Sequence, residues 1–147
     1  MNLTIPDKKE VRFSVLGKPQ PKSRPRFTKS GHAYTPTKTK DYETMIGQCA
    51  WVKMWDGKLR PTKSPVHLEM IAYLPIPKSF PERRRMQALA GAIRPPKPDL
   101  DNILKTVLDG CNRIVYEDDK QVYSIWARKV YETWDVKPSI MICFSWT

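Results

Sequence analysis

Two aspartates separated by one residue stand in the middle of a strongly basic chain. They are Asp99 and Asp101, in the stretch KPDLDN, and a second acidic group, EDD, follows at residues 117–119. Oxygen ligands such as carboxylates are those that Mg²⁺ and Ca²⁺ prefer when they converge on one point. The D-x-D spacing at the start of a helix could supply two ligands, and Asp118 or Asp119 could supply a third if a return segment brought it back to the helix start.

The same residues have an ordinary structural explanation, which the spacing leaves open. Asp99 is placed to cap a helix that begins beside it, because helix N-termini favour carboxylates. Asp101 and Lys105 are four residues apart, so they can form an ion pair on one flank of that helix. The EDDK segment is also a common polar turn. In the functional alternative, Lys105 and Asn102 instead offer a cation and an amide to a phosphate.

The net charge indicates the kind of partner. The 147 residues include 26 Lys+Arg and 15 Asp+Glu, for a formal charge of +11 and a pI near 9.7. Such a field attracts polyanions, so nucleic acid or an anionic membrane surface is the expected partner. No apolar run approaches the roughly 20 residues that span a bilayer. The dispersed cysteines Cys49, Cys111 and Cys143 lack a C-x-x-C pair, which favours free thiols in a reducing cytoplasm over a zinc site.

Apolar periodicity predicts an α+β fold in a single domain, residues 1–147. The predicted strands are residues 11–16, 65–74, 121–131 and 139–146, and the predicted helices are residues 37–55, 80–92 and 99–112. Because helices and strands do not alternate regularly, a small mixed or antiparallel sheet flanked by helices is favoured over a doubly wound sheet.

The two longer helices carry apolar stripes that indicate which face is buried. In helix 37–55, Thr37 or Thr39 is expected to be the cap, and the stripe consists of Tyr42, Met45, Ile46, Cys49 and Val52 or Lys53. In helix 99–112, Gly110 is expected to end the helix, and the core-facing stripe consists of Leu100, Ile103, Leu104, Val107 and Leu108.

Residues 17–40 form a basic segment that is broken by prolines and cannot be a regular helix. Its cations are interleaved with Phe27 and Tyr34. This is either a solvated surface loop or an arm that contacts phosphates and bases, as the combination of cations and aromatics favours. A second basic stretch, RPPKP, leads into Asp99. The candidate DNA-binding residues are Lys22, Arg24, Arg26, Lys29, Arg94 and Lys97. The cluster Arg83–Arg85 is either a solvated helix face or a further DNA contact.

The segments PDLDNILK and EDDKQV, in this order, resemble the paired motifs of the RusA family of Holliday junction resolvases. In that family a D-L-D-N-x-x-K block is followed by a D-D-x-Q-V block. The early segments GKPQPKSRPRF and YTPTKT are also similar to those of Gram-positive and phage-type members. Relative to the compact members, this chain has a longer basic loop and an insert rich in Pro and Arg near residues 75–98.

The resemblance implies a RusA-like fold and a small homodimeric endonuclease that cuts four-way DNA junctions in recombination and repair. It implies Mg²⁺ as cofactor, with Mn²⁺ as a possible substitute. Matched by motif, the essential aspartates are Asp99, Asp101 and Asp119, which would hold the metal, and the functional lysine is Lys105. Asp118 and Asn102 would be secondary. Metal-bound water would then attack the phosphorus, and Lys105 would stabilise the transition state.

Two other functions remain compatible with the sequence. A non-catalytic basic nucleic-acid-binding protein would account for the charge and the aromatics, but the carboxylates would weaken its grip on DNA. A metal-dependent nuclease acting on another branched or single-stranded DNA would use the same site. Metal titration separates the first function from a nuclease, and a comparison of four-way, flap and linear substrates separates the second from a junction resolvase.

Overall fold

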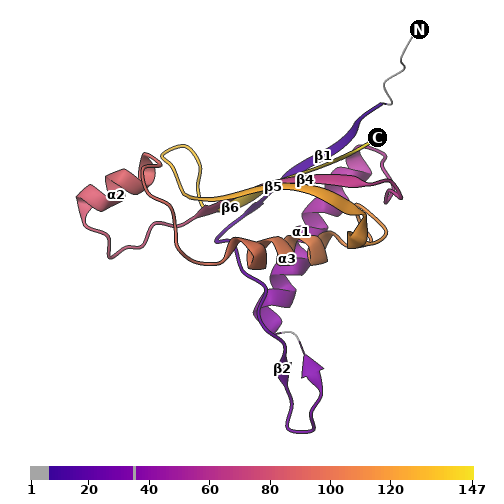
Figure 1. Cartoon of the computed structure of the whole chain (residues 1–147), viewed down its shortest axis with the longest axis horizontal. Coiled ribbons are helices and arrows are strands. Elements are labelled where there is room, and N and C mark those ends of the chain that lie inside the picture. Colours follow the sequence, from indigo (N-terminus) through magenta and orange to yellow (C-terminus); the bar gives the residue numbers. More distant parts are fainter. Residues whose placement is uncertain (1–6, 35) are drawn as a thin grey trace.

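A four-stranded mixed sheet lies at the centre of the computed structural model, which describes residues 7–34 and 36–147 (Figure 1). Its strands are β1 (Lys9–Leu16), β4 (Val66–Leu74), β5 (Val122–Tyr131) and β6 (Ser139–Trp146). They lie in the order β1-β6-β4-β5, with β4 and β5 parallel and the other neighbours antiparallel. The predicted α+β class with a mixed sheet is confirmed.

One face of the sheet is covered by two helices, α1 (Thr37–Asp56) and α3 (Leu100–Cys111). Alternation along β4 turns Val66, Leu68 and Met70 toward them, and all three are fully buried. The core is therefore a sheet-and-helix interface, as the alternating pattern of residues 65–74 predicts.

Among the described residues, no helix is both long enough and apolar enough to cross a membrane.

A long crossover connects the parallel strands β4 and β5, as parallel pairing requires. It contains α2 (Glu82–Leu89), which stands at one end of the sheet over a small separate apolar cluster, then α3, then a 3₁₀ turn, η1 (Asp119–Gln121). Helix α3 begins beside the end of β5, because the Lys129 ammonium donates hydrogen bonds to the carbonyls of Pro96 (2.9 Å) and Pro98 (3.1 Å). It then runs back toward the start of that strand.

The start and the buried face of α1 differ from the sequence expectation. The N-cap residue is Pro36, and no side chain within residues 7–34 and 36–147 caps the helix, whereas the Thr39 hydroxyl is buried and donates to Ser23 Oγ at 2.6 Å. The predicted threonine cap is thus wrong, because Thr39 holds the basic segment instead. Met45 (45% exposed) and Val52 (50% exposed) also lie outside the buried face. That face consists of Thr39, Tyr42, Ile46, Gly47, Ala50 and Met54.

The expectation that Gly110 ends α3 is also wrong, since the helix continues to Cys111 with Asn112 as its C-cap residue. Gly110 is needed for packing instead. A Cβ at this position would lie 2.8 Å from the Glu43 carbonyl oxygen, and one at Gly47 would lie 2.7 Å from the Gly110 carbonyl oxygen. The two glycines therefore allow the backbones of α1 and α3 to touch.

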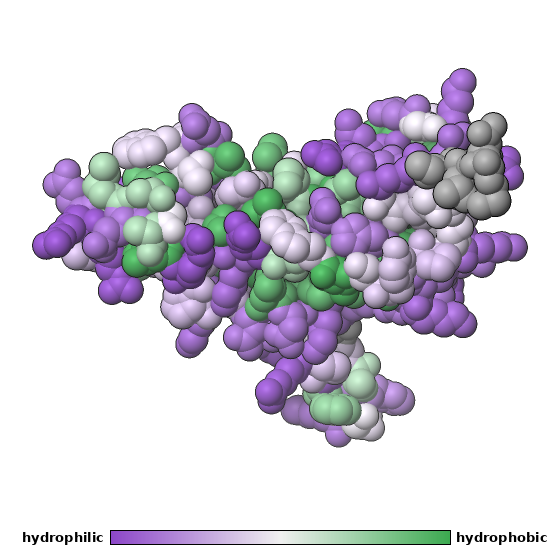
Figure 2. All heavy atoms as spheres, turned by 45° about the horizontal axis from the view of Figure 1, so that its top comes forward, coloured by the Kyte–Doolittle hydropathy of each residue, from purple (hydrophilic) through white to green (hydrophobic). Residues whose placement is uncertain are grey.

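The basic segment contains a small hairpin that was not predicted from the sequence. Strands β2 (Arg26–Phe27) and β3 (Ala33–Tyr34) pair antiparallel. Thr28 orders the turn between them: its amide donates to the His32 carbonyl at 2.9 Å and its carbonyl accepts from the Gly31 amide at 2.9 Å. The hairpin projects away from the sheet and helices as a separate knob (Figures 1 and 2).

The contact between the two glycines yields a stability prediction. Gly110→Ala should lower the free energy of unfolding by about 1–3 kcal/mol, the usual range for overpacking, because the added methyl meets backbone rather than a movable side chain. Denaturant unfolding measures it. Gly57→Ala at the end of α1 is the matched control and should change stability by less than about 0.5 kcal/mol. Helix propensity alone would make the Gly110→Ala protein more stable, because alanine is favoured over glycine in a helix. A more stable variant would therefore show that the helices do not touch here.

Candidate active site

The start of α3 presents two carboxylates and a cation to solvent. Asp99 is the N-cap residue, in an extended conformation with φ −63° and ψ 135°, and Asp101 lies in the first turn. Lys105 follows one turn further along, and all three residues are exposed. The bonds from Lys129 to the carbonyls of Pro96 and Pro98 fix the chain just before Asp99. The position of the D-x-D pair is therefore set by β5.

Asp99 occupies the expected N-cap position, but the side-chain bonds of the ordinary explanation are absent among the described residues. The Asp99 side chain makes no capping hydrogen bond to the helix. Among the ion pairs formed within residues 7–34 and 36–147, none joins Asp101 to Lys105. The three side chains are thus exposed on the surface without the bonds that would make them merely structural.

The basic segment is attached directly to this end of α3. The Lys22 amide donates to the Asn102 carbonyl at 2.9 Å, and the same carbonyl accepts from the Thr106 hydroxyl at 3.1 Å. Asn102 therefore has a positioning role through its backbone, in addition to the role expected of its amide side chain. The hairpin leaves the body of the protein a few residues beyond this contact.

The second acidic group is held by a reciprocal cap. The Asp118 carboxylate accepts from the Lys120 amide at 2.9 Å, and Gln121 Oε1 accepts from the Asp118 amide at 2.9 Å. The hydrogen bond from Lys120 is the main reason why the pKa of Asp118 is lowered. Gln121 also donates to the carbonyls of Thr62 (2.7 Å) and Ser64 (3.0 Å). Sequence reasoning missed this anchor, although D-x-x-Q is a capping-box pattern.

Asp119 is exposed beside the cap, and its electrostatic neighbours are acidic. Its pKa is raised, first by partial desolvation and then by Asp118 and Asp109. Asp109 belongs to the last turns of α3, far from Asp99 and Asp101 along the helix. Asp119 therefore lies near the opposite end of α3 from the D-x-D pair.

The distance between the two acidic groups follows from β5. Asp119 comes just before the start of this strand, whereas Lys129, near its end, holds Pro98 next to Asp99. At about 3.3 Å per residue, Val122 and Lys129 are about 20 Å apart. The part of the chain that the structure describes contains no group of three His, Cys, Asp or Glu residues that could hold a metal. The expected return of the acidic turn to the helix start thus does not occur within one chain.

Lys22 also has a different setting from that expected. Its ammonium donates to Glu43 at 2.5 Å and lies 3.0 Å from the Asp109 carboxylate. Burial acts against the charged form, but the hydrogen bonds to these carboxylates leave the Lys22 pKa raised. Because two internal anions already compensate its charge, we assign Lys22 to the joint between the basic segment, α1 and α3 rather than to phosphate contact.

The other candidate DNA-binding residues are exposed. Arg24, Arg26 and Lys29 lie on or next to the hairpin, and none of them takes part in an ion pair among the described residues. They surround the exposed rings of Phe27 and Tyr34. Elsewhere, Arg94 donates to the Gly91 carbonyl at 2.8 Å, and Lys97 stands at the edge of a cavity next to Asp99. Cations thus lie on both approaches to the D-x-D pair.

A basic α+β domain with exposed carboxylates at a helix start has the features expected of an enzyme that acts on a polyanion, and comparison with known proteins names the class. The family model described as "Endodeoxyribonuclease RusA" matches residues 17–142. The chain therefore belongs to the RusA family of endodeoxyribonucleases. This confirms the resemblance seen in the PDLDNILK and EDDKQV segments, and it identifies the protein as an enzyme that cuts DNA.

The chain is also similar to a bacterial protein over most of its length. The protein is 32% identical over 130 residues to "Uncharacterized protein YqaN" of Bacillus subtilis (strain 168). The alignment covers 82% of this chain and 87% of the relative. The likeness thus extends over nearly the whole length of both proteins.

The different settings of Lys22 and Arg24 predict different defects. Arg24→Ala should leave stability unchanged within about 0.5 kcal/mol and reduce the slope of log affinity for DNA against log salt by about 0.9, the value for one lost phosphate contact. Lys22→Ala should lower the free energy of unfolding by about 1–3 kcal/mol, because it leaves two carboxylates without their partner. Thermal unfolding and salt-dependent binding measure the two effects. The assignment of Lys22 is wrong if both variants behave alike.

Proposed function

We propose that this protein is a structure-specific endonuclease that resolves four-way DNA junctions by paired phosphodiester hydrolysis in recombination and repair. The observation that carries the proposal is the exposed group of Asp99, Asp101 and Lys105 at the start of α3, directly attached to a basic hairpin. Membership of the RusA family supplies the reaction class. The three cysteines of this protein are free thiols. Free thiols and a DNA substrate both favour a cytoplasmic location.

The cofactor proposed is Mg²⁺, with Mn²⁺ as a substitute, bound by Asp99, Asp101 and Asp119. A divalent cation held by carboxylates neutralises phosphate charge and lowers the pKa of a bound water. One chain does not provide this set, because Asp119 precedes the start of β5, whereas Asp99 follows Pro98, which Lys129 holds about 20 Å further along that strand. No catalytic step is therefore assigned to a metal bound by a single copy.

A homodimer reconciles the ligand set with the geometry. In a two-fold dimer, a contact from residue i of one subunit to residue j of the other is repeated from j to i. The acidic turn of each subunit can therefore face the α3 start of the other subunit. Asp99 and Asp101 of one subunit would then share a site with Asp119 of the partner subunit. Two such sites would be related by the dyad, which suits a four-way junction, in which two of the four strands must be cut symmetrically.

The remaining side chains have roles that need no metal. Lys105, one turn from Asp101, would hold a phosphate oxygen. Arg24, Arg26 and Lys29 on the hairpin, and Arg94 and Lys97 before Asp99, would contact the backbone on either side of the cut. Asp118 holds the turn that carries Asp119, so it acts as a positioning residue.

Substitution of Asp101 tests the site. Asp101→Asn should reduce junction cleavage by about 100-fold or more, a loss typical when a transition-state contact is removed, and should leave junction affinity equal or tighter because a negative charge is gone. Removal of divalent ions by a chelator should stop cleavage by the unmodified protein, and Mg²⁺ should restore it. Asp135→Asn, an exposed carboxylate between β5 and β6, is the matched control.

The measurement compares four-way, flap and linear duplex DNA at fixed salt, in both binding and cutting. Normal cleavage by the Asp101→Asn variant would show that Asp101 is not part of the active site. Faster cutting of flap or linear DNA than of four-way junctions would leave a nuclease but reject junction resolution.

Mixed dimers test whether the site is shared between subunits. Asp101→Asn and Asp119→Asn chains, each inactive alone, are unfolded together and refolded. In a shared site, one of the two sites of the mixed dimer receives Asp101 from one chain and Asp119 from the other. Such a dimer should regain the ability to nick one strand per junction. Random pairing makes about half of the dimers mixed, so at most about half of all dimers should regain this activity. If all three aspartates acted within one chain, every site would carry a lesion and the mixture would stay inactive.

A further inference from the structure

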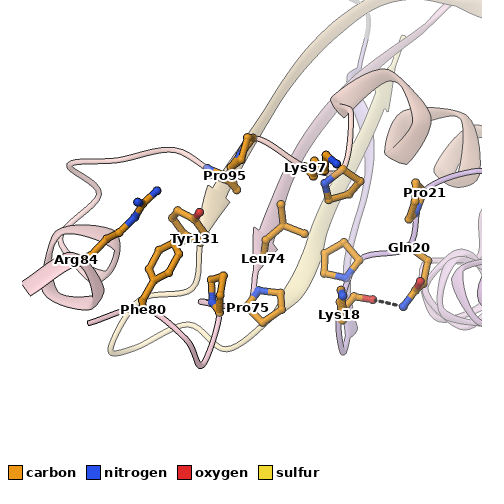
Figure 3. Close-up of a pocket in the computed structure, with 14 residues that line it drawn as sticks. Lys18, Gln20, Pro21, Leu74, Pro75, Phe80, Arg84, Pro95, Lys97 and Tyr131 are labelled. Atoms are coloured by element: carbon orange, nitrogen blue, oxygen red, sulfur yellow. Dashed lines mark hydrogen bonds between the residues drawn. The ribbon is translucent and has the colours of Figure 1, made fainter. Parts of the chain in front are cut away.

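A cavity of about 460 Å³ lies between α2 and the start of α3, and the proposed catalysis does not use it (Figure 3). Segments distant in the sequence form it: residues 18–21, the end of β4, α2 with its lead-in, the proline run before Asp99, and the end of β5. A volume of this size is typical of small-molecule and cofactor sites.

The floor of the cavity is apolar and partly aromatic. Leu74 and Tyr131 are buried beneath it, and Phe80 packs edge-to-face on Tyr131 with ring centroids 5.9 Å apart and an interplanar angle of 72°. The prolines Pro75 and Pro95 continue the apolar wall (Figure 3). A flat aromatic guest can therefore lie against rings and proline faces rather than against flexible aliphatic chains.

The charged residues that line the cavity are all cations, namely Lys18, Arg84 and Lys97. The guanidinium of Arg84 stands 4.5 Å from the centroid of the Phe80 ring, over its face. No carboxylate belongs to the lining, although the D-x-D pair begins one residue beyond it. The cavity thus joins an aromatic floor to a positive rim, which suits a guest with a flat apolar part and an anionic part.

Hydrogen bonds from the end of β5 hold the walls in place. Lys129 binds the carbonyls of Pro96 and Pro98 in one wall. Opposite, the Glu132 carboxylate accepts from the Ile76 amide at 2.8 Å, and the Glu132 amide donates to the Leu74 carbonyl at 2.7 Å. The cavity is therefore preformed in the free protein, which lowers the entropic cost of binding.

We propose that this cavity binds one unpaired nucleotide of the DNA substrate. Its base would lie against Phe80 beside the Arg84 guanidinium, which stands over one face of that ring, and its phosphates would lie against the cations of the rim. Pro98 lines the cavity and Asp99 follows it directly, so a nucleotide held here would adjoin the phosphate presented to the D-x-D pair. The inference rests on the proposed function only in that the unpaired nucleotide comes from DNA distorted near the cut. Enzymes that carry out chemistry on a DNA base take that base out of the stack into such a pocket, so a pocket of this kind can hold an extruded nucleotide.

Base recognition can be separated from simple charge attraction with two short probes. One is a thymidine oligonucleotide of about eight nucleotides, a typical single-strand site size, and the other is an abasic chain with the same number of phosphates. The unmodified protein should bind the thymidine probe roughly 5- to 150-fold more tightly, the range for one stacked base. Phe80→Leu should remove most of this preference, and Phe80→Trp should keep it. Binding is measured at fixed salt with each variant checked by thermal unfolding.

Matched variants isolate the cavity from the rest of the surface. Arg84→Gln and Lys97→Gln should each weaken the binding of both probes by a similar factor. Each should also reduce the slope of log affinity against log salt by about 0.9. Arg85→Gln, on the same helix but outside the lining, should have less effect than Arg84→Gln. Trp134→Leu removes an aromatic that is 74% exposed outside the cavity and should leave the thymidine preference unchanged.

Equal affinity of the unmodified protein for the two probes would overturn the proposal, as would a preference that Phe80→Leu leaves intact. Either result would leave an apolar peptide as the better guest for the cavity. Cleavage of four-way junctions by the unmodified protein is measured in parallel. A Phe80-dependent preference without junction cleavage would reject the proposed function and keep the cavity, whereas the reverse result would reject the cavity alone.

Discussion

The touching backbones of α1 and α3 at Gly47 and Gly110 set the position of the remaining functional groups. Because the helices approach so closely, Glu43 on α1 and Asp109 on α3 lie near enough to share the ammonium of Lys22. The amide of that lysine in turn binds the carbonyl of Asn102, next to the D-x-D pair. One steric constraint thus fixes the helix that carries the acids and the segment that carries the cations.

The two acidic groups are kept apart by the same architecture. The first is placed at the start of α3, and the second at the start of β5, near the other end of that helix. Their separation limits like-charge repulsion within one chain, since exposed charges more than about 10 Å apart are largely screened at moderate salt. In the proposed dimer, each chain would therefore keep its acidic groups apart, on a fold with a net charge of +11, until two copies pair.

The sequence allowed the local features to be predicted and left the long-range ones hidden. The strands and helices carry strong periodicity, and PDLDNILK contains the helix start and its acids in one stretch. The role of Gly110 depended on a helix more than fifty positions away, so its usual meaning as a helix terminator was misleading. Thr39 likewise bonds to Ser23 rather than to its own helix. The cavity could not be predicted because its walls come from five separate segments, and no single one of them has the composition of a binding site.

The anchoring of the two acidic groups has a consequence for their response to the solution. Gln121 holds the acidic turn through amide hydrogen bonds to the carbonyls of Thr62 and Ser64. Neither an amide nor a carbonyl titrates in the physiological range or pairs with dissolved ions. The joint at Lys22, by contrast, adds ion pairs, which salt weakens, to the hydrogen bond between the Lys22 amide and the Asn102 carbonyl. Rising ionic strength should therefore weaken one part of the attachment of the hairpin to α3, while the hydrogen bonds that hold the turn with Asp119 are unaffected.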